Sequence, residues 1–224
     1  MDLKTRDLPG TAAFFGRTLG WRFAVDESDW RRATKASAGG HPVAGMSDLA
    51  NPVYPPGTPA HIACYLAVDD VDGRTEAAVA HGASLVVPPF DAGDQGRVAT
   101  LVDPAGAAFS LWSARAFAGW DFPPGTAGAP HGMVLACAAP ERARDFYAAT
   151  VGGPLADAEF VAAPAESAPR WLPVIGVPDP EAVAVRAPGH ATWAQDSRGP
   201  VLRLVAPDGL AVLVRPAVAR TPED

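Results

Sequence analysis

Two pairs of segments in this chain resemble each other, and they limit the folds that it can adopt. Residues 8–21 (LPGTAAFFGRTLGW) are echoed by residues 140–153 (PERARDFYAATVGG), and both predict a helix that ends at a glycine. Residues 96–106 are echoed by residues 199–209, and both predict a strand, a tight turn and a second strand. The first pair is offset by 132 residues and the second by 103. We therefore expect the C-terminal half to repeat the N-terminal half with about 29 residues deleted from its middle.

Each half is expected to contain two units in which a strand and a helix are followed by further strands. The predicted elements are, in order, strand 3–6, helix 9–19, strands 21–25, 30–35 and 43–46, strand 61–68, helix 71–82, strands 84–88, 97–102 and 107–112, strand 133–137, helix 141–151, strands 159–162 and 171–177, and a hairpin over 201–215. Residues 119–130 are rich in glycine and proline, as a linker would be. We therefore expect a first domain over 1–118, a linker over 119–130 and a second, shortened domain over 131–224. Whether the units pair within a half or across the halves stays open.

A βαβββ module used twice per half resembles the glyoxalase, bleomycin-resistance and extradiol-dioxygenase family, the vicinal oxygen chelate superfamily. The resemblance is carried by the helix that ends in Leu19-Gly20-Trp21, by residues 65–72 (YLAVDDVD) and by residues 103–112 (DPAGAAFSLW). It implies an α+β fold in which tandem βαβββ modules form two glyoxalase-like domains with curved mixed sheets. In that family each domain curls into a cup that holds the ligand.

The resemblance also says where a metal would bind. Metal-dependent members place a His or Gln at the start of a module's first strand and a Glu on its last strand. His61 stands at such a histidine position, but Ser110 stands where the glutamate is expected. In the second half, His131 opens a strand, and its counterparts are Trp171 and Leu213. One histidine per domain without a carboxylate cannot make a three-ligand site, so we expect no metal and no other cofactor.

Strand alternation selects the side chains that would face the cup. It places His61 and Tyr65 on one face of their strand, with Ser110 and Trp112 facing inward on a later strand. Trp112 and Trp171 are expected at inward positions, where a planar ligand could stack on them. The full set of expected ligand contacts is His61, Tyr65, Ser110, Trp112, Trp30, Tyr54, Met133 and Trp171. By contrast, Asp69 and Asp70 are expected to cap a helix, and Asp103 is expected to hold a turn.

Composition excludes several classes of function. The net charge of −7 argues against a nucleic-acid partner. No apolar run approaches the length of a membrane span, and the first residues do not form a signal peptide. Two cysteines are too few for a disulfide framework, so we expect a cytoplasmic protein. Its expected partner is a hydrophobic, aromatic small molecule. The protein partners left open are a biosynthetic enzyme and a second copy of the chain.

These observations support one leading hypothesis and two alternatives. The leading one is a metal-free protein that binds a planar natural product, such as an anthracycline-like or other aromatic polyketide. Its role would be drug sequestration, self-resistance or assistance to antibiotic biosynthesis. The first alternative is a cofactor-independent cyclase or isomerase that uses His61 as its acid or base, since histidine exchanges protons near neutral pH. The second is a metal-dependent lyase or dioxygenase with ligands at unexpected positions. Whether the chain is an enzyme is left open, with a binder favoured.

Overall fold

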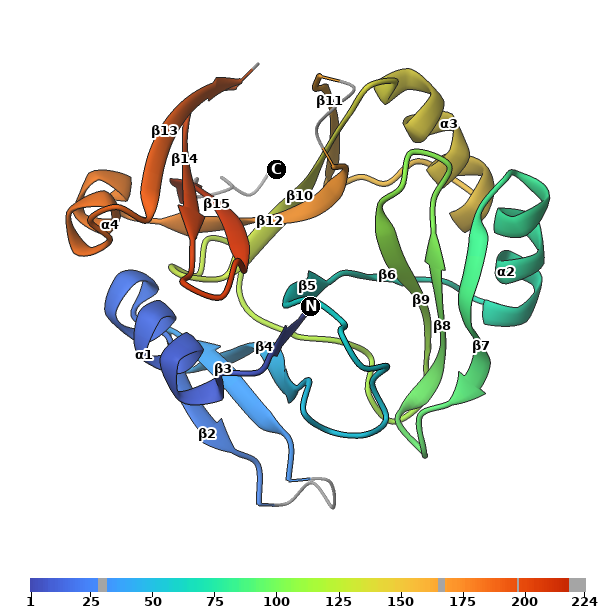
Figure 1. Cartoon of the computed structure of the whole chain (residues 1–224), viewed down its shortest axis with the longest axis horizontal. Helices are drawn as coiled ribbons and strands as arrows, with labels where there is room; N and C mark the ends of the chain where they lie inside the picture. The colour runs from blue at the N-terminus through green and yellow to red at the C-terminus, as the bar shows by residue number, and fades with distance from the viewer. Residues whose placement is uncertain (28–31, 165–167, 197, 218–224) are drawn as a thin grey trace, which may run out of the picture. The chain divides into compact units, whose positions relative to one another are not determined.

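The computed structural model describes residues 1–27, 32–164, 168–196 and 198–217. Trp30, one of the expected ligand contacts, lies outside the described residues. Within them, no helix is both long and apolar enough to cross a membrane. The elements are β1 (Asp2–Thr5), α1 (Leu8–Leu19), β2 (Arg22–Val25), β3 (Thr34–Ala38), β4 (His41–Asp48), β5 (His61–Ala63), β6 (Tyr65–Ala67), α2 (Val71–Ala80), β7 (Ser84–Asp91), β8 (Gly96–Val102), β9 (Ala108–Ala114), β10 (Pro130–Cys137), α3 (Pro140–Val151), β11 (Ala158–Ala162), β12 (Arg170–Val177), α4 (Pro180–Arg186), β13 (Ala191–Asp196), β14 (Gly199–Val205) and β15 (Ala211–Pro216) (Figure 1).

The contacts divide the chain into two compact units, and each unit takes residues from both halves of the sequence. Unit 1 comprises Met1–Ile62, Trp120–His131 and Pro173–Asp224, and unit 2 comprises Ala63–Gly119 and Gly132–Leu172. The expected boundaries at 118 and 131 divide the chain along its length, whereas these units interleave its halves. Unit 1 therefore contains the first and last modules, and unit 2 contains the two middle ones.

The same pairing rule recurs in all four modules. The first strand of a module lies parallel to its last strand, as β1 does to β4, β6 to β9 and β12 to β15. In these three modules the two intervening strands run antiparallel to their neighbours. The fourth module has only β10, α3 and β11, and β11 lies parallel to β10. Thus β11 takes the place of a last strand, and the missing residues correspond to the second and third strands.

The α+β class and the order of the main elements agree with the sequence, but α4 and β13 were not expected. Helix α4 has only seven residues, which is too short for a 3.6-residue periodicity to stand out. Strand β13 is exposed along four of its six residues, so it lacks the alternation of a half-buried strand. Asp179 starts α4 by accepting a hydrogen bond from the Ala182 amide, an N-cap signal that was available in the sequence.

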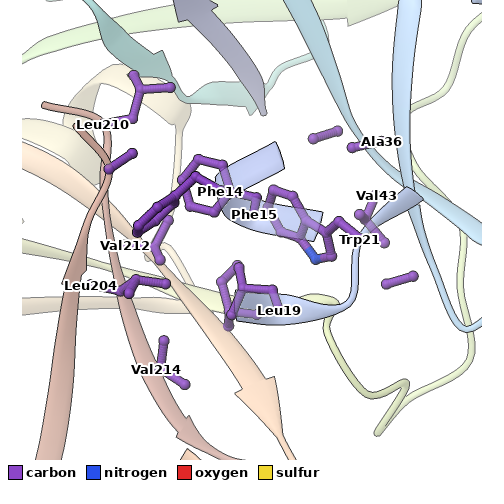
Figure 2. Close-up of a cluster of buried hydrophobic side chains, with 14 of the residues drawn as sticks. Phe14, Phe15, Leu19, Trp21, Ala36, Val43, Leu204, Leu210, Val212 and Val214 are labelled. Carbon is purple, nitrogen blue, oxygen red and sulfur yellow. The ribbon is translucent and has the colours of Figure 1, made fainter. Parts of the chain in front are cut away.

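Helices cover one face of the strands in each unit, and the core lies between them. In unit 1, Phe14, Phe15 and Leu19 of α1 pack with Trp21 and with buried residues of β4, β14 and β15 (Figure 2). The indole of Trp21 donates a hydrogen bond to the Gly128 carbonyl at 2.7 Å. In unit 2, Phe109, Leu111, Leu135, Tyr147 and Trp171 belong to a second buried cluster that includes residues of α2 and α3.

In both units a turn carboxylate, buried in unit 2 and partly buried in unit 1, reaches a helix from the other half of the chain. Asp103 accepts hydrogen bonds from the amides of residues 105–107 at 2.8–2.9 Å, as expected of a turn residue. Its second oxygen accepts a hydrogen bond from the Tyr147 hydroxyl on α3 at 2.8 Å. In unit 1, Asp208 accepts hydrogen bonds from the hydroxyls of Thr5 and Thr11 at 2.6 and 2.8 Å. These bonds tie together modules that are far apart in sequence.

Candidate functional site

The four-stranded sheet of unit 2 has one face against α2 and an opposite face that carries aromatic and hydroxyl side chains. Toward the helix, Leu66, Leu101 and Leu111 are buried in the core. The residues between them form two rows in register: Tyr65, Ser110 and Thr100, then Ala67, Trp112 and Val98. We call this surface the Tyr65–Trp112 face. Strand alternation therefore brought Tyr65, Ser110 and Trp112 together as expected.

Trp112 is fixed in place on this face from three sides. Its ring meets Tyr65 edge-on, with centroids 6.2 Å apart, and meets Phe117 at the same distance. Its indole Nε1 donates a hydrogen bond to the Phe117 carbonyl at 3.1 Å. Gly96 makes room for the ring, because a Cβ at that position would lie 2.5 Å from Cζ2 of Trp112. A side chain held in this way presents its aromatic surface without losing further rotamer freedom on binding.

The polar groups of the face are neutral hydroxyls. Ser110 Oγ and Thr100 Oγ1 lie 2.9 Å apart, and Ser110 is buried. Ser110 occupies the position where metal-dependent relatives would carry a glutamate, and a hydroxyl bonded to a neighbouring hydroxyl is not a first-choice ligand. Across the described ranges, no three His, Cys, Asp or Glu side chains are grouped closely enough to hold a metal ion. The residues present therefore do not fit a metal centre of the family type.

The face continues onto the outer strand β7, which is apolar and exposed. Val87 is in register with Thr100, and Phe90 is in register with Val98. The exposed fractions of Val87 and Phe90 are 37% and 49%. The surface thus combines aromatic rings, aliphatic side chains and two hydroxyls, which suits a flat, largely apolar molecule with a few oxygen atoms.

Trp171 lies elsewhere in unit 2, and this corrects the orientation expected for it. It is only 4% exposed, and it shares its side of β12 with Ile175 and Val177, which are also buried. Its indole donates a hydrogen bond to the Tyr147 hydroxyl at 2.8 Å. Met133 packs against the same buried cluster. The helix-covered layer, not an open cup, therefore surrounds both side chains.

Burial changes the acid–base behaviour of two groups in that layer. Burial, together with the nearby charge of Asp103, holds the pKa of the Tyr147 hydroxyl far above its usual range. Burial also raises the pKa of the Cys64 thiol to about 11. Both groups are therefore protonated at neutral pH, and neither is poised as a nucleophile.

His61 and Tyr54 belong to unit 1. The single strand expected over 61–68 is instead two strands, β5 and β6, in different sheets, so the prediction that His61 shares a strand face with Tyr65 is wrong. His61 lies on β5, and its Nδ1 is 2.9 Å from the Pro59 carbonyl oxygen. Because a carbonyl only accepts, Nδ1 carries the proton of the neutral ring and Nε2 has a lone pair. The Tyr54 hydroxyl accepts a hydrogen bond from Lys4 Nζ at 3.0 Å.

Several contributors to the Tyr65–Trp112 face were not named from the sequence, among them Val98, Thr100, Gly96 and Phe90. Val98 and Thr100 could be assigned to this face from the alternation of side chains along residues 96–102, once it is known which alternate set faces away from the helix. Gly96 and Phe90 gave no usable signal in the sequence. Gly96 contributes to the face by lacking a side chain. The irregular register of β7 hides the phase of Phe90.

Comparison with known proteins places the chain in a family. A glyoxalase-like domain model matches residues 1–112. The anthracycline biosynthesis protein DnrV of Streptomyces peucetius is 30% identical over 157 residues, which is 65% of this chain and 57% of that protein. DauV of Streptomyces sp. (strain C5), another anthracycline biosynthesis protein, is 30% identical over 50% of this chain and 44% of its own length. A Mycobacterium tuberculosis protein named as a glyoxylase, CFP32, is 34% identical over 51% of this chain and 44% of its own length. The chain spans about half the length of these curated relatives.

Solved structures share the fold at low sequence identity. The Mn(II)-bound glyoxalase of Novosphingobium aromaticivorans superposes with a TM-score of 0.61 at 16% identity, over 97% of this chain and 81% of that one. Homoprotocatechuate 2,3-dioxygenase of Brevibacterium fuscum superposes with a TM-score of 0.62 at 10% identity, over 99% and 81%. The repeated βαβββ plan and the structural neighbours agree with the family match, and the chain belongs to the glyoxalase-like domain family.

Proposed function

We propose that this protein binds a planar aromatic polyketide of the anthracycline type at the Tyr65–Trp112 face and assists its biosynthesis. The observation that carries the proposal is the fixed indole of Trp112 beside Tyr65 on an otherwise apolar sheet face. An aromatic pair contributes about 0.5–1.5 kcal/mol beyond the burial of apolar area, so a fused ring system gains from both. The Ser110 and Thr100 hydroxyls offer hydrogen bonds to ring oxygens.

The relatives support the same ligand class. DnrV and DauV are named as anthracycline biosynthesis proteins, and the DnrV match covers 65% of this chain. Binding of this kind would serve delivery to a biosynthetic enzyme, sequestration of the product or self-resistance. Cys64 and Cys137 are both free and buried, which is consistent with the reducing cytoplasm we assign to the protein.

The test is binding of a tetracyclic anthracyclinone, measured by calorimetry and by quenching of tryptophan fluorescence. Trp112→Leu keeps apolar volume but removes the aromatic plane, and we expect it to weaken binding by about tenfold or more. Trp193→Leu is the matched control, because Trp193 is a half-exposed strand tryptophan on β13 of unit 1. We expect its affinity to stay within twofold of wild type.

Equal losses in the two variants, or no saturable binding by wild type, would overturn the proposal. Circular dichroism of each variant confirms that it is folded. Incubation with the ligand should return it unchanged, as analysed by chromatography, if the protein is a binder.

A second candidate function is a cofactor-independent cyclase or isomerase that uses His61. The observation in its favour is the Nδ1 contact with the Pro59 carbonyl, which leaves Nε2 as a proton acceptor. His61→Gln retains a donor and an acceptor but removes the titrating base. A general base typically contributes about 10²–10⁴ in rate. Turnover that collapses in His61→Gln while affinity survives would establish the enzyme, and intact affinity without turnover in either protein supports the binder.

Metal content separates both candidates from a metal-dependent lyase or dioxygenase. Ser110 stands where the carboxylate ligand is expected. We therefore predict that elemental analysis finds only background transition metal, roughly 0.1 ion per chain or less. EDTA should leave ligand affinity unchanged. A tightly bound metal near one per chain would contradict this prediction.

A further inference from the structure

The sheet face of unit 1 that lies opposite α1 carries a network of charged and hydroxyl groups. On β1, Leu3 is buried in the core, whereas Asp2 and Lys4 point to the other side. Asp2 is in register with Gly45, and Lys4 is in register with Ser47. This face is therefore polar where the Tyr65–Trp112 face is aromatic.

The network is ordered around Asp2. One oxygen of Asp2 accepts hydrogen bonds from Lys4 Nζ at 2.9 Å and from Ser47 Oγ at 2.8 Å. Gly45 leaves space for the carboxylate, since a Cβ there would lie 2.8 Å from Asp2 Oδ1. The side chains of Lys4 and Asp2 are only 13% and 15% exposed, so the ion pair is little screened by solvent.

Tyr54 stands at the end of this network. Lys4 Nζ donates a hydrogen bond to the Tyr54 hydroxyl at 3.0 Å and lies 4.7 Å from the centre of its ring. The hydroxyl is thus an acceptor toward Lys4, and its own proton has no acceptor among the residues that the structure describes. Consecutive hydrogen bonds polarise one another, so the ammonium makes this hydroxyl a better donor.

The charge balance indicates what the hydroxyl would bind. Asp2 neutralises Lys4, and Lys35, the second of the chain's two lysines, is paired with Asp26. A face whose lysines are already neutralised offers little net attraction to a full anion. It is suited to a neutral oxygen acceptor such as a ketone or quinone carbonyl.

We propose that the Tyr54 hydroxyl, polarised by Lys4, donates a hydrogen bond to the carbonyl oxygen of a neutral ketone or quinone group. This inference rests on the proposed function for the class of ligand, a flat aromatic molecule with ring oxygens, and it concerns the sheet face of unit 1 by itself. Asp2 and Ser47 act as positioning residues, because they hold Lys4 and do not themselves reach the ligand.

The experiment compares two neutral probes that differ only in their ring carbonyls, 2-(hydroxymethyl)anthraquinone and 2-(hydroxymethyl)anthracene. We expect wild type to bind the quinone about fivefold more tightly, the value of one ordinary hydrogen bond. Tyr54→Phe should abolish this preference and leave the affinity for the anthracene probe unchanged. Thr58→Ala is the matched control, because Thr58 donates a hydrogen bond to Pro55 within the same loop without touching Lys4. It should retain the preference.

Each outcome decides between the two proposals. Equal affinity of wild type for both probes, or a preference that survives in Tyr54→Phe, overturns the carbonyl inference and leaves the aromatic-binding proposal standing. A preference lost equally in Thr58→Ala assigns the effect to loop structure and also overturns it. Failure of wild type to bind either probe overturns both proposals.

Discussion

Units 1 and 2 are built from the same module, yet the sheet faces opposite their helices have different chemistry. Unit 1 presents the Asp2–Lys4 ion pair with Ser47 and Tyr54, and unit 2 presents Tyr65 and Trp112 with two hydroxyls. Their helix-covered faces are alike, with apolar residues at alternate strand positions. Only one face of each strand is constrained by the core, so the other is free to vary with function.

The units also differ in completeness. Unit 1 combines two modules with all their strands, whereas unit 2 combines one full module with the short β10–α3–β11 module. Strand β11 consequently ends its sheet, while β4, β9 and β15 each have an antiparallel neighbour. Unit 2 has less sheet to stabilise it, and we expect its remaining tertiary bonds to carry more weight.

The largest difference is expected at the two turn carboxylates, of which Asp103 is buried and Asp208 is partly exposed. Asp103→Ala removes the acceptor of three amides and of the buried Tyr147 hydroxyl, and it should lower the free energy of unfolding by about 4 kcal/mol. Asp208→Ala should cost about 2 kcal/mol, because Thr11 still donates to Thr5 at 3.1 Å. Urea unfolding followed by fluorescence and circular dichroism measures both.

Tyr147→Phe serves as the control for this pair. It removes the hydroxyl that donates to Asp103 and accepts from the Trp171 indole, but it leaves the three amide hydrogen bonds of Asp103 in place. Its cost should fall below that of Asp103→Ala. Should Asp208→Ala prove the more damaging substitution, the idea that unit 2 depends more on its turn carboxylate would be wrong.

The turn carboxylates also show which contacts could be predicted from the sequence and which could not. The Asp-Pro-x-Gly pattern predicted the local role of Asp103, because an Asx turn involves only neighbouring residues. Its bond to Tyr147 joins positions 44 residues apart, and the bond of Asp208 to Thr5 joins positions 203 apart. Repeats and alternation predicted the modules and the position of Tyr65, Ser110 and Trp112 on one face of a sheet. They could not predict that modules pair across the halves, and so they misjudged the surroundings of Trp171.

Alkaline pH should destabilise unit 2 in particular, because Tyr147 and Cys64, whose pKa values are raised, both lie in it. In the unfolded chain Cys64 loses its proton near pH 9, while in the folded protein its pKa is about 11. Between these values the folded state binds more protons than the unfolded state, so stability falls as pH rises. The loss attributable to Cys64 is about 3 kcal/mol, with Tyr147 adding to it above about pH 10.

Denaturant unfolding at half-unit steps from pH 8 to 11.5 measures this slope. Cys64→Ala should be less stable at pH 8 but should lose less stability between pH 9 and 11 than wild type. Identical slopes for the two proteins would show that the thiol does not contribute.

Each sheet face has a glycine that accommodates its central side chain, and the two should differ in tolerance. An alanine Cβ at Gly96 would lie 2.6 Å from the Ser113 carbonyl as well as against Trp112, and backbone cannot easily move. We expect Gly96→Ala to cost about 2 kcal/mol and to weaken aromatic binding. At Gly45 the nearest atom is the end of the Asp2 side chain, so Gly45→Ala should cost less than about 1 kcal/mol.

Thermal unfolding and anthracyclinone titration of both variants test this contrast. Gly45→Ala should leave the Trp112-dependent affinity intact. A Gly96→Ala protein with wild-type stability and affinity would mean that the Trp112 ring has an alternative position of equal energy.

The smallest expected effect concerns the helix of the short module. Helices α1, α2 and α4 are preceded by the N-cap residues Asp7, Asp70 and Asp179, whose side chains accept hydrogen bonds from amides of the first turn. The N-cap residue of α3 is Ala139, whose side chain cannot accept a hydrogen bond, although its backbone angles, φ −135° and ψ 72°, resemble those of Asp7. Ala139→Asp should therefore fit without strain and stabilise the protein by about 0.5–1 kcal/mol through the new hydrogen bond and the helix dipole. Ala139→Asn retains the hydrogen bond without the charge and should give a smaller gain. Thermal unfolding of both variants and of wild type measures these differences in stability. A loss of stability in Ala139→Asp would show that the new side chain disturbs the packing of α3 by more than the added hydrogen bond stabilises it.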